Sequence, residues 1–442
     1  MTSPRATRPH VTAPWWGLGA AVVLMVCAMA IPAAFGWQVR ADSFPPLHAK
    51  WLPRVGPGTL PALALAVVGG TWALSAAQNL PWRRLLALTW VFGAAWMFSL
   101  ALVDGVSGID GILGSPYEYL RTARATTDIS ATLHEYISRI PSDSSAPWPV
   151  HVAGHPPGAL MFFVLLVRLG LGSDLVAGIV VVLLAATTPV AVLVAARALG
   201  VELQGRRALP FVVLAPAAIW QAVSADAMFA AVAAWGLATL ALGAARRSVG
   251  WSLLAGVILG YTVTLSYGLP LLAFLAVAVL LAARAWFPLG FAVVGALAVV
   301  LTFAALGFPW WEALPVLHER YWDGLASLRP ASYWLWGNLA ALAFCAGPLL
   351  GAALASAGPH LVAAVRRPSQ HVVGVLVVAA VLTVVAADVS LMSKAEVERI
   401  WLPFVPWLLL STVFLPERWR RPGLVLQIGM TLALQHLLWT DW

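Results

Sequence analysis

Apolar residues fall along this chain in long runs that contain almost no charged side chain. The first run extends from Trp15 to Trp37, and about 20 such residues form a helix that crosses the ~30 Å hydrocarbon core of a membrane. A helix on each run predicts about thirteen spans, at residues 13–37, 59–78, 85–103, 174–196, 208–223, 226–245, 250–267, 269–283, 286–308, 335–357, 372–390, 401–416 and 422–440. The pattern therefore predicts an all-α polytopic membrane protein.

The apolar segment 157–172 is shorter than the others and carries Arg168 near its end. As a helix it would reach only about 24 Å, so we expect it to enter the membrane without crossing it. The N-terminus then lies in the cytoplasm and the C-terminus outside. In this topology the cytoplasmic loops collect the arginine pairs at 83–84, 206–207, 246–247 and 366–367. That asymmetry agrees with the positive-inside rule.

Composition excludes the other broad classes of protein. Of the 442 residues 61% are hydrophobic and 10% charged, and the mean hydropathy is +0.87, which no water-soluble chain shows. The net charge of +8 does not indicate nucleic-acid binding, because the basic residues lie in short loops that set orientation. Cys27 and Cys345 lie in separate apolar runs, which argues against a disulfide framework or a cysteine metal site. The first apolar run exceeds a signal-peptide core and is interpreted as a retained span.

Most chemically capable side chains fall in the predicted extracytoplasmic loops at 38–58, 104–156, 309–334 and 391–400. Loops beyond about 15 residues are uncommon unless they are functional, so we expect the site on this face. Three regions follow from the spans and loops. Residues 1–83 form a two-span extension, 84–285 a central module, and 286–442 a set of C-terminal membrane helices.

The longest loop, 104–156, carries helix signals of its own. Ser115-Pro116-Tyr117-Glu118 has capping-box spacing with proline at the first helical position, which predicts a short helix over 118–124. Beyond Thr127, the apolar residues Ile129, Leu133, Ile137 and Ile140 recur at helical spacing. They predict an amphipathic helix in the membrane interface. Together with segment 157–172, juxtamembrane helices therefore bridge two spans.

Three short sequence elements, taken in their order along the chain, resemble those of a known family. An acid ends a span in Leu102-Val103-Asp104-Gly105, His155-Pro156-Pro157-Gly158 follows the long loop, and Ser224-Ala225-Asp226-Ala227 places an acid at the outer start of a later span. This order resembles the GT-C superfamily of membrane glycosyltransferases, nearest to the protein O-mannosyltransferase and lipid A aminoarabinose transferase branch. The resemblance covers roughly residues 84–285. It implies a GT-C-like fold and a polyprenyl-phosphate-sugar-dependent, inverting glycosyltransferase.

The resemblance also implies the setting of the reaction. The sugar would pass to an envelope glycolipid, polysaccharide or protein at the outer face of a bacterial plasma membrane. A composition rich in alanine, valine, leucine, arginine and tryptophan and poor in lysine and asparagine is typical of GC-rich bacteria, in which mannose and arabinose are the usual donors of the superfamily. No cofactor is implied with certainty, and the need for a divalent cation stays open.

The resemblance assigns the general base to Asp104, and the alternative is an acid that merely ends a helix. The O-mannosyltransferase branch carries an Asp-Glu pair at this point, whereas Gly105 follows here. Glu118 is therefore a second catalytic candidate, although a capping box explains it equally well. Asp226 is a third candidate, for orienting sugar hydroxyls, with a helix N-cap as the alternative.

Positive charge or hydrogen-bond donors are needed for the departing phosphate. The candidates for this role lie in the outer loops and are His155, His318, Arg320, Arg329, Lys394 and Arg399. Arg399 could instead pair with Glu396 on a helix or reach toward the interface. Tyr321 and Trp322 are candidates for stacking on a sugar, whereas most of the 23 tryptophans are expected to form an interfacial belt.

Two other classes of function fit the same composition. A secondary transporter would show repeated halves and broken or charged positions near mid-span, and we find no internal repeat. A lipid or glycan flippase, or an envelope assembly factor without enzymatic activity, is the alternative that the sequence leaves open. The requirement for Asp104 separates these classes from the glycosyltransferase.

Overall fold

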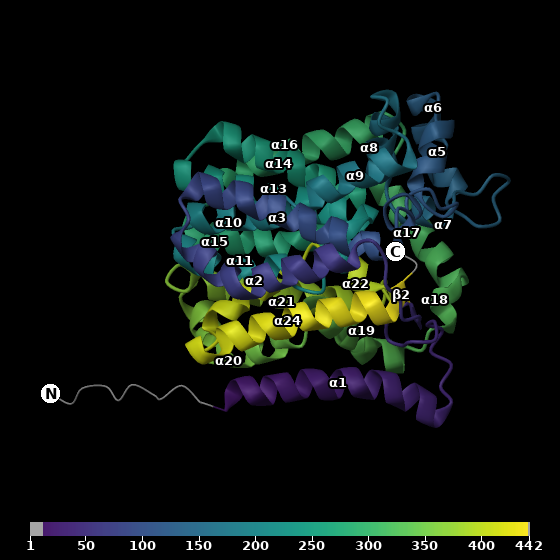
Figure 1. The fold of residues 1–442 in the computed structure, drawn as a ribbon. Coiled ribbons are helices and arrows are strands. Elements are labelled where there is room, and N and C mark those ends of the chain that lie inside the picture. Colours follow the sequence, from purple (N-terminus) through teal and green to yellow (C-terminus); the bar gives the residue numbers. More distant parts are fainter. Residues whose placement is uncertain (1–11, 441–442) are drawn as a thin grey trace.

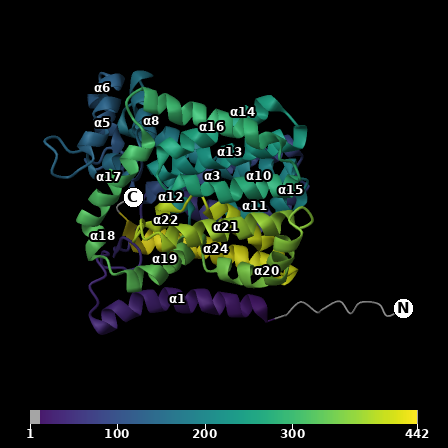
Figure 2. The same cartoon turned by 180° about the vertical axis from the view of Figure 1, so that it is seen from behind.

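The computed structural model describes residues 12–440 and is nearly all helical. Most helices lie side by side along one direction, and the short helices gather at one end of the bundle (Figures 1 and 2). Among the described residues, eight helical segments are long and apolar enough to cross a membrane. They are α1 (Ala13–Phe35), α2 (Thr59–Asn79), α3 (Trp82–Ala101) with the 3-10 turn to Asp104, α9 and α10 together (Asp174–Ala198), α13 (Ala225–Arg246), α16 (Phe287–Ala305), α20 (Leu349–Arg366) and α21 (Val372–Val389). A helical membrane protein is thus confirmed.

The remaining predicted spans are helices that are shorter, broken or less apolar than a membrane crossing requires. The apolar helices α8 (Pro157–Arg168), α14 (Val249–Leu265), α15 (Ala273–Ala283) and α23 (Val405–Leu409) fall short of a full crossing length. α24 (Glu417–Leu437) begins earlier than predicted, with a polar first turn. The segment at 157–172 forms only the 12-residue α8, as its length indicates.

Two predicted spans are wrong as single helices. Residues 208–223 divide into α11 (Glu202–Val213) and α12 (Ala218–Ala222), because Pro216 cannot continue the hydrogen-bond ladder. Residues 335–357 divide into α19 (Ala331–Ala346) and α20, with Gly347 at φ 82°. The Gln427 side chain donates to the free carbonyl of Ala346 (2.6 Å), and a Cβ at Gly347 would lie 1.7 Å from the Gln427 amide oxygen.

A two-stranded antiparallel sheet corrects the strictly all-α prediction. β1 (Ala49–Trp51) pairs with β2 (Leu438–Thr440), so that Lys50 faces Trp439. The strands join the loop at residues 38–58 to the end of α24. This pairing could not be foreseen, because each strand has only three residues and no alternating pattern.

Helices of the long loop and of the later loops lie at the same end of the bundle (Figure 1). They are α4 (Ser107–Asp110), α5 (Tyr119–Ala125), α6 (Ile129–His134), α7 (Val150–Gly154), α17 (Trp310–Asp323), α18 (Leu325–Leu328) and α22 (Val397–Ile400). The predicted amphipathic helix is present but interrupted, since α6 ends at His134 and a 3-10 turn follows at Ile137–Arg139. Of the predicted apolar stripe, Leu133 and Ile140 are buried inside the protein.

The capping-box prediction is wrong. Glu118 is not the third residue of a helix but the N-cap of α5, with an extended backbone and no capping bond from its side chain. Its carboxylate is therefore available for contacts elsewhere.

Burial ranks the long helices and places one of them at the centre. Of the α13 residues that would cross a membrane, 83% are buried, and α13 packs against α9, α10, α14 and α15. In α1, α2 and α16 the corresponding share is 17%, so these helices lie at the periphery. The start of α13, which carries Asp226, thus sits in the middle of the end that bears the loops.

Candidate functional site

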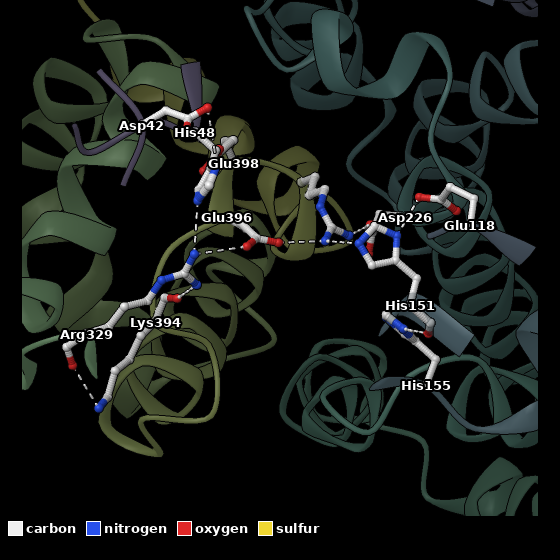
Figure 3. A network of polar contacts seen from close by, with 11 residues as sticks. Asp42, His48, Glu118, His151, His155, Asp226, Arg329, Lys394, Glu396 and Glu398 are labelled. Carbon is white, nitrogen blue, oxygen red and sulfur yellow. Dashed lines mark hydrogen bonds and ion pairs between the residues drawn. The ribbon is translucent and has the colours of Figure 1, made fainter. Parts of the chain in front are cut away.

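Six charged or histidine side chains from distant parts of the chain meet beneath the loops. Figure 3 shows them as a continuous line of polar contacts. This charge cluster consists of Glu118, His151, Asp226, Arg329, Glu396 and Arg399. Only Glu396 and Arg399 were linked by a sequence pattern, because the other four members come from four separate elements, α5, α7, α13 and the end of α18.

Asp226 and Arg399 form the buried centre of the charge cluster. The Arg399 Nη1 donates to the Asp226 Oδ2 at 2.6 Å, and both side chains are less than a tenth exposed. Ser224, not Asp226, caps α13 by accepting from the Ala227 N–H (3.1 Å), so the N-cap alternative for Asp226 is wrong. In the first turn, the helix dipole favours the negative charge of Asp226.

Arg399 also binds Glu396, the pairing that the i, i+3 spacing predicts. Its Nη2 lies 2.8 Å from the Glu396 Oε2, while the Glu396 Oε1 accepts from Arg329 at 3.2 Å. Burial alone would raise the pKa of Glu396, but the two guanidinium groups lower it to about 2. Glu396 is therefore a permanently charged bridge between two arginines.

Glu118 and His151 extend the charge cluster on the side of α5 and α7. The Glu118 Oε1 lies 2.6 Å from the His151 Nδ1, and the His151 Nε2 lies 3.4 Å from the Arg399 Nη2. Because an arginine only donates, these contacts fit a neutral His151 that carries its proton on Nδ1. The second carboxylate oxygen of Glu118 is buried and has no hydrogen-bond partner.

His155, which the sequence analysis gives as a candidate phosphate ligand, lies next to His151. Its Nδ1 lies 2.9 Å from the His151 carbonyl oxygen, and its ring packs against Tyr119 and Phe229. Burial lowers the pKa of His155, so the ring is neutral near pH 7. His155 therefore supports His151 and supplies no positive charge.

Arg329 connects the charge cluster to the loop at residues 38–58. It donates to the His48 Nε2 at 3.0 Å and to the Lys394 carbonyl oxygen at 2.6 Å. The Lys394 ammonium donates to the carbonyl oxygens of Ala326 (3.1 Å) and Arg329 (3.0 Å). Lys394, a predicted phosphate ligand, thus holds α18 and its following residue in place.

Glu398 is a fully buried carboxyl beside the charge cluster that the sequence analysis passed over. Its Oε1 accepts from the His48 backbone N–H (3.3 Å), and its Oε2 has no partner. Burial, together with the charge of Glu396, raises the pKa of Glu398 to about 7. Glu398 is therefore a proton-binding group close to neutral pH.

Both carboxylate oxygens of Asp104 are held by neighbouring side chains, whereas a general base would need an oxygen open to the acceptor. It forms an ion pair with Arg54, whose Nη2 lies 3.0 Å from the Asp104 Oδ2 while the Nε donates to the Oδ1. The Gln435 amide also donates to the Oδ2, at 3.1 Å. Arg54 in turn donates to the Leu438 carbonyl oxygen at 2.6 Å. Asp104 therefore joins the end of α3 to the β1–β2 region.

The predicted sugar and phosphate ligands on α17 contact backbone groups and neighbouring side chains outside the charge cluster. The Arg320 guanidinium donates to the carbonyl oxygens of Ile140 and Trp148, and so fixes the end of the long loop. Trp322 donates to the His318 Nε2 at 3.1 Å, and its ring lies 4.2 Å from the Lys394 ammonium. The Tyr321 hydroxyl accepts from the Lys394 N–H at 2.9 Å. These residues border the charge cluster without joining it.

Metal binding finds no ready donor set in the part of the chain that the structure describes. There, no group of three or more His, Cys, Asp or Glu side chains could hold a metal ion. The carboxylates of the charge cluster are instead held by arginine.

The arrangement offers two chemical capacities in one buried place. Glu118 has one carboxylate oxygen without a hydrogen-bond partner. Arg399 supplies positive charge close by, because His151 contacts both Glu118 and Arg399. In a water-poor environment both act more strongly than at the surface. His151 was missed as a site residue because His155, four residues later, carries the more conspicuous proline motif.

No protein-family model, curated protein or solved structure matches this chain.

Proposed function

We propose that this protein is an integral membrane glycosyltransferase that moves a sugar from a polyprenyl-phosphate donor to an acceptor hydroxyl of the cell envelope. The observation that carries the proposal is the environment of Glu118, a buried carboxylate with one oxygen on His151 and the other without a partner. Glycosyl transfer to a hydroxyl needs a base within hydrogen-bond reach. The sugar, the lipid phosphate and the GT-C-like fold come from the sequence resemblance, and the figure of about thirteen membrane segments comes from the apolar runs of the sequence.

In the proposed reaction, the Glu118 Oε2 accepts the proton of the acceptor hydroxyl while the hydroxyl oxygen attacks the anomeric carbon. The bond between that carbon and the phosphate oxygen breaks, which inverts the anomeric centre. His151 holds Glu118 in position through Nδ1. Arg399 then stabilises the negative charge on the departing phosphate, and Asp226 and Glu396 hold Arg399 in place.

The resemblance assigns the base to Asp104, whereas the geometry favours Glu118. Hydrogen bonds to a carboxylate stabilise its charged form and make it a weaker base. Both oxygens of Asp104 receive such bonds, from Arg54 and Gln435, whereas one oxygen of Glu118 receives none. Asp104 then acts as an anchor for the loops above the site.

The first test compares envelope glycans and glycolipids, by mass spectrometry, in a strain that lacks this protein and in the same strain complemented with it. We expect the deletion to remove one glycan unit, which names the sugar and the acceptor. Unchanged glycans would contradict the proposal. Loss of a glycan unit without any transfer activity of the purified protein would favour a flippase.

The second test assigns the base in the purified protein, with the polyprenyl-phosphate sugar that the first test identifies. Glu118→Gln is expected to lower the turnover number by about 10²–10⁴-fold, because it removes the proton acceptor. Asp104→Asn is expected to reduce it mainly through lower stability. Asp174→Asn is the matched control, since Asp174 pairs with Arg124 at the surface. Full activity of Glu118→Gln with loss in Asp104→Asn would return the base to Asp104.

A further inference from the structure

The last residues of α15 and α20 lie at the end of the bundle opposite the short helices that surround the charge cluster (Figure 1). A basic pocket lies between the turns that follow these two helices. Two turns form it, one between α15 and α16 and the other between α20 and α21. The pocket has a volume of about 450 Å³ and is lined by Arg284, Trp286, Arg366, Arg367, Ser369 and Gln370, among others. Nothing in the proposed transfer reaction uses these residues.

The charges of the pocket are all positive. Three of its lining residues are arginines, and none is acidic. Within residues 12–440, no ion pair involves Arg284, Arg366 or Arg367. The three arginines are exposed, and an anion in the pocket would meet positive charge with no acidic side chain in the lining.

One arginine of the pocket, Arg284, connects the two turns. Arg284 ends α15 in the left-handed conformation (φ 51°), where glycine is the usual residue. Its Nε donates to the Ser369 hydroxyl, which joins the two turns although they are far apart in the sequence. Guanidinium groups bind phosphate oxygens through two parallel hydrogen bonds, so this lining suits a phosphate group.

An apolar surface begins at the rim of the pocket. Trp286 and Phe287 are 52% and 45% exposed, and the exposed side of α16 continues through Val294 and Leu297. Tryptophan at such a place is typical of a membrane interface. A soluble anion would make no use of this surface, whereas the acyl chains of a lipid would lie along it.

From the pocket and its apolar rim we infer a binding site for the phosphate headgroup of an anionic phospholipid, with the acyl chains along α16. The site is independent of the proposed transfer reaction, and its ligand is a structural lipid and not a substrate. Arg366 and Arg367 bind the phosphate, and Arg284 closes the pocket from the other turn.

Native mass spectrometry of the full-length protein in detergent tests this inference, with phosphatidylglycerol and phosphatidylcholine as probes. We expect phosphatidylglycerol to bind the wild type at least about tenfold more tightly than phosphatidylcholine. The double variant Arg366→Gln/Arg367→Gln is expected to lose this preference. The matched control is Arg246→Gln/Arg247→Gln, which removes an arginine pair from the neighbouring turn between α13 and α14, and should retain it.

Two results would overturn the inference. One is equal phosphatidylglycerol binding by the wild type and the Arg366/Arg367 variant. The other is displacement of phosphatidylglycerol by an excess of inorganic phosphate, which would indicate a site for a soluble anion. The wild type provides a readout that does not depend on folding of the variants, because a lipid bound only to the native state raises the Tm. Absence of a Tm increase with phosphatidylglycerol relative to phosphatidylcholine would also contradict the site.

Discussion

Arg399 is the residue on which the charge cluster depends, because it holds two carboxylates and contacts His151. Without it, Asp226 and Glu396 would each lose a buried counter-charge. An unpaired charge in a protein interior is costly, since burial removes its hydration and no partner replaces it. The stability of this end of the molecule is thus linked to the residues proposed for transfer.

The Arg399→Gln variant is expected to lose about 3–5 kcal/mol of unfolding free energy, the usual cost of breaking a buried ion pair. Arg124→Gln, which breaks the exposed pair with Asp174, is expected to lose at most about 1 kcal/mol. Thermal unfolding of both variants in detergent measures the difference. Equal Tm values for the two variants would contradict a buried cluster.

Glu398 predicts a pH dependence whose sign follows from its raised pKa. The folded pKa of about 7 exceeds the ordinary value of 4.5, so the folded state binds the proton more tightly than the unfolded chain. This contribution to stability is fully present below pH 4.5 and is lost as the pH rises through about 7. Glu396, with its pKa lowered to about 2, stabilises the fold above pH 4.5 and ceases to do so as the pH falls toward 2.

Between pH 5 and pH 8, the Tm of the wild type is therefore expected to fall relative to that of Glu398→Gln, which cannot titrate. The measurement is a pair of Tm–pH profiles in the same detergent. Parallel profiles would show that Glu398 is ionised throughout, and that its buried oxygen has a partner in solution.

A double-mutant cycle decides whether Asp104 is mainly an anchor. Asp104→Asn and Arg54→Gln each break the same ion pair, so the double variant is expected to be little less stable than either single one. The Tm of the four proteins gives the coupling. Additive losses would mean that Asp104 and Arg54 act independently, and would leave Asp104 free for a catalytic role.

At the scale of elements, close approach between helices depends on single glycines. α1 packs along α20, where a Cβ at Gly17 would lie 2.1 Å from the Gly351 carbonyl oxygen. Gly19, two residues later, has nothing within 4 Å of its Cβ position. The two glycines look alike in the sequence, and only the packing of α1 distinguishes them.

Gly17→Val is accordingly expected to move α1 away from α20 and to cost about 1–3 kcal/mol, the usual range for overpacking. Gly19→Val should change the Tm little. Cysteine cross-linking between α1 and α20, followed alongside the Tm, checks whether the contact is lost. An unchanged cross-link in Gly17→Val would contradict the packing.

At the scale of the whole molecule, the loops that carry the site all lie at one end of the bundle (Figure 2). The sequence predicts that this end is extracytoplasmic. Cysteines placed at the exposed Ser145 and Ser327 should react on intact cells with a maleimide that cannot cross the membrane. A cysteine at Gln370, exposed at the opposite end, should react only after lysis. The reverse pattern would invert the topology.

The charge pattern and the apolar runs were sufficient for the class of protein, and they identified the loops that gather at one end of the bundle. In a membrane, a long charge-free segment must form a helix, because each of its backbone N–H and C=O groups needs a hydrogen-bond partner within the segment. For the same reason most helices lie close to their predicted positions, α1, α2, α13 and α21 among them. Asp226 was identified as a candidate because an acid at the start of a span is costly, and Arg399 because it lies in a short charged loop where it could bind a phosphate.

Only the tertiary structure decided which of these candidates meet. Arg399 contacts Asp226 across 173 positions of the chain, and Glu118 meets His151 across 33. Helical periodicity relates only residues three or four positions apart, so the sequence carries no direct signal for such pairs. The same limit hid the arginine partner of Asp104 and the β1–β2 pairing. The local sequence pattern determined the helices of this protein, and tertiary packing determined which side chains form its candidate site.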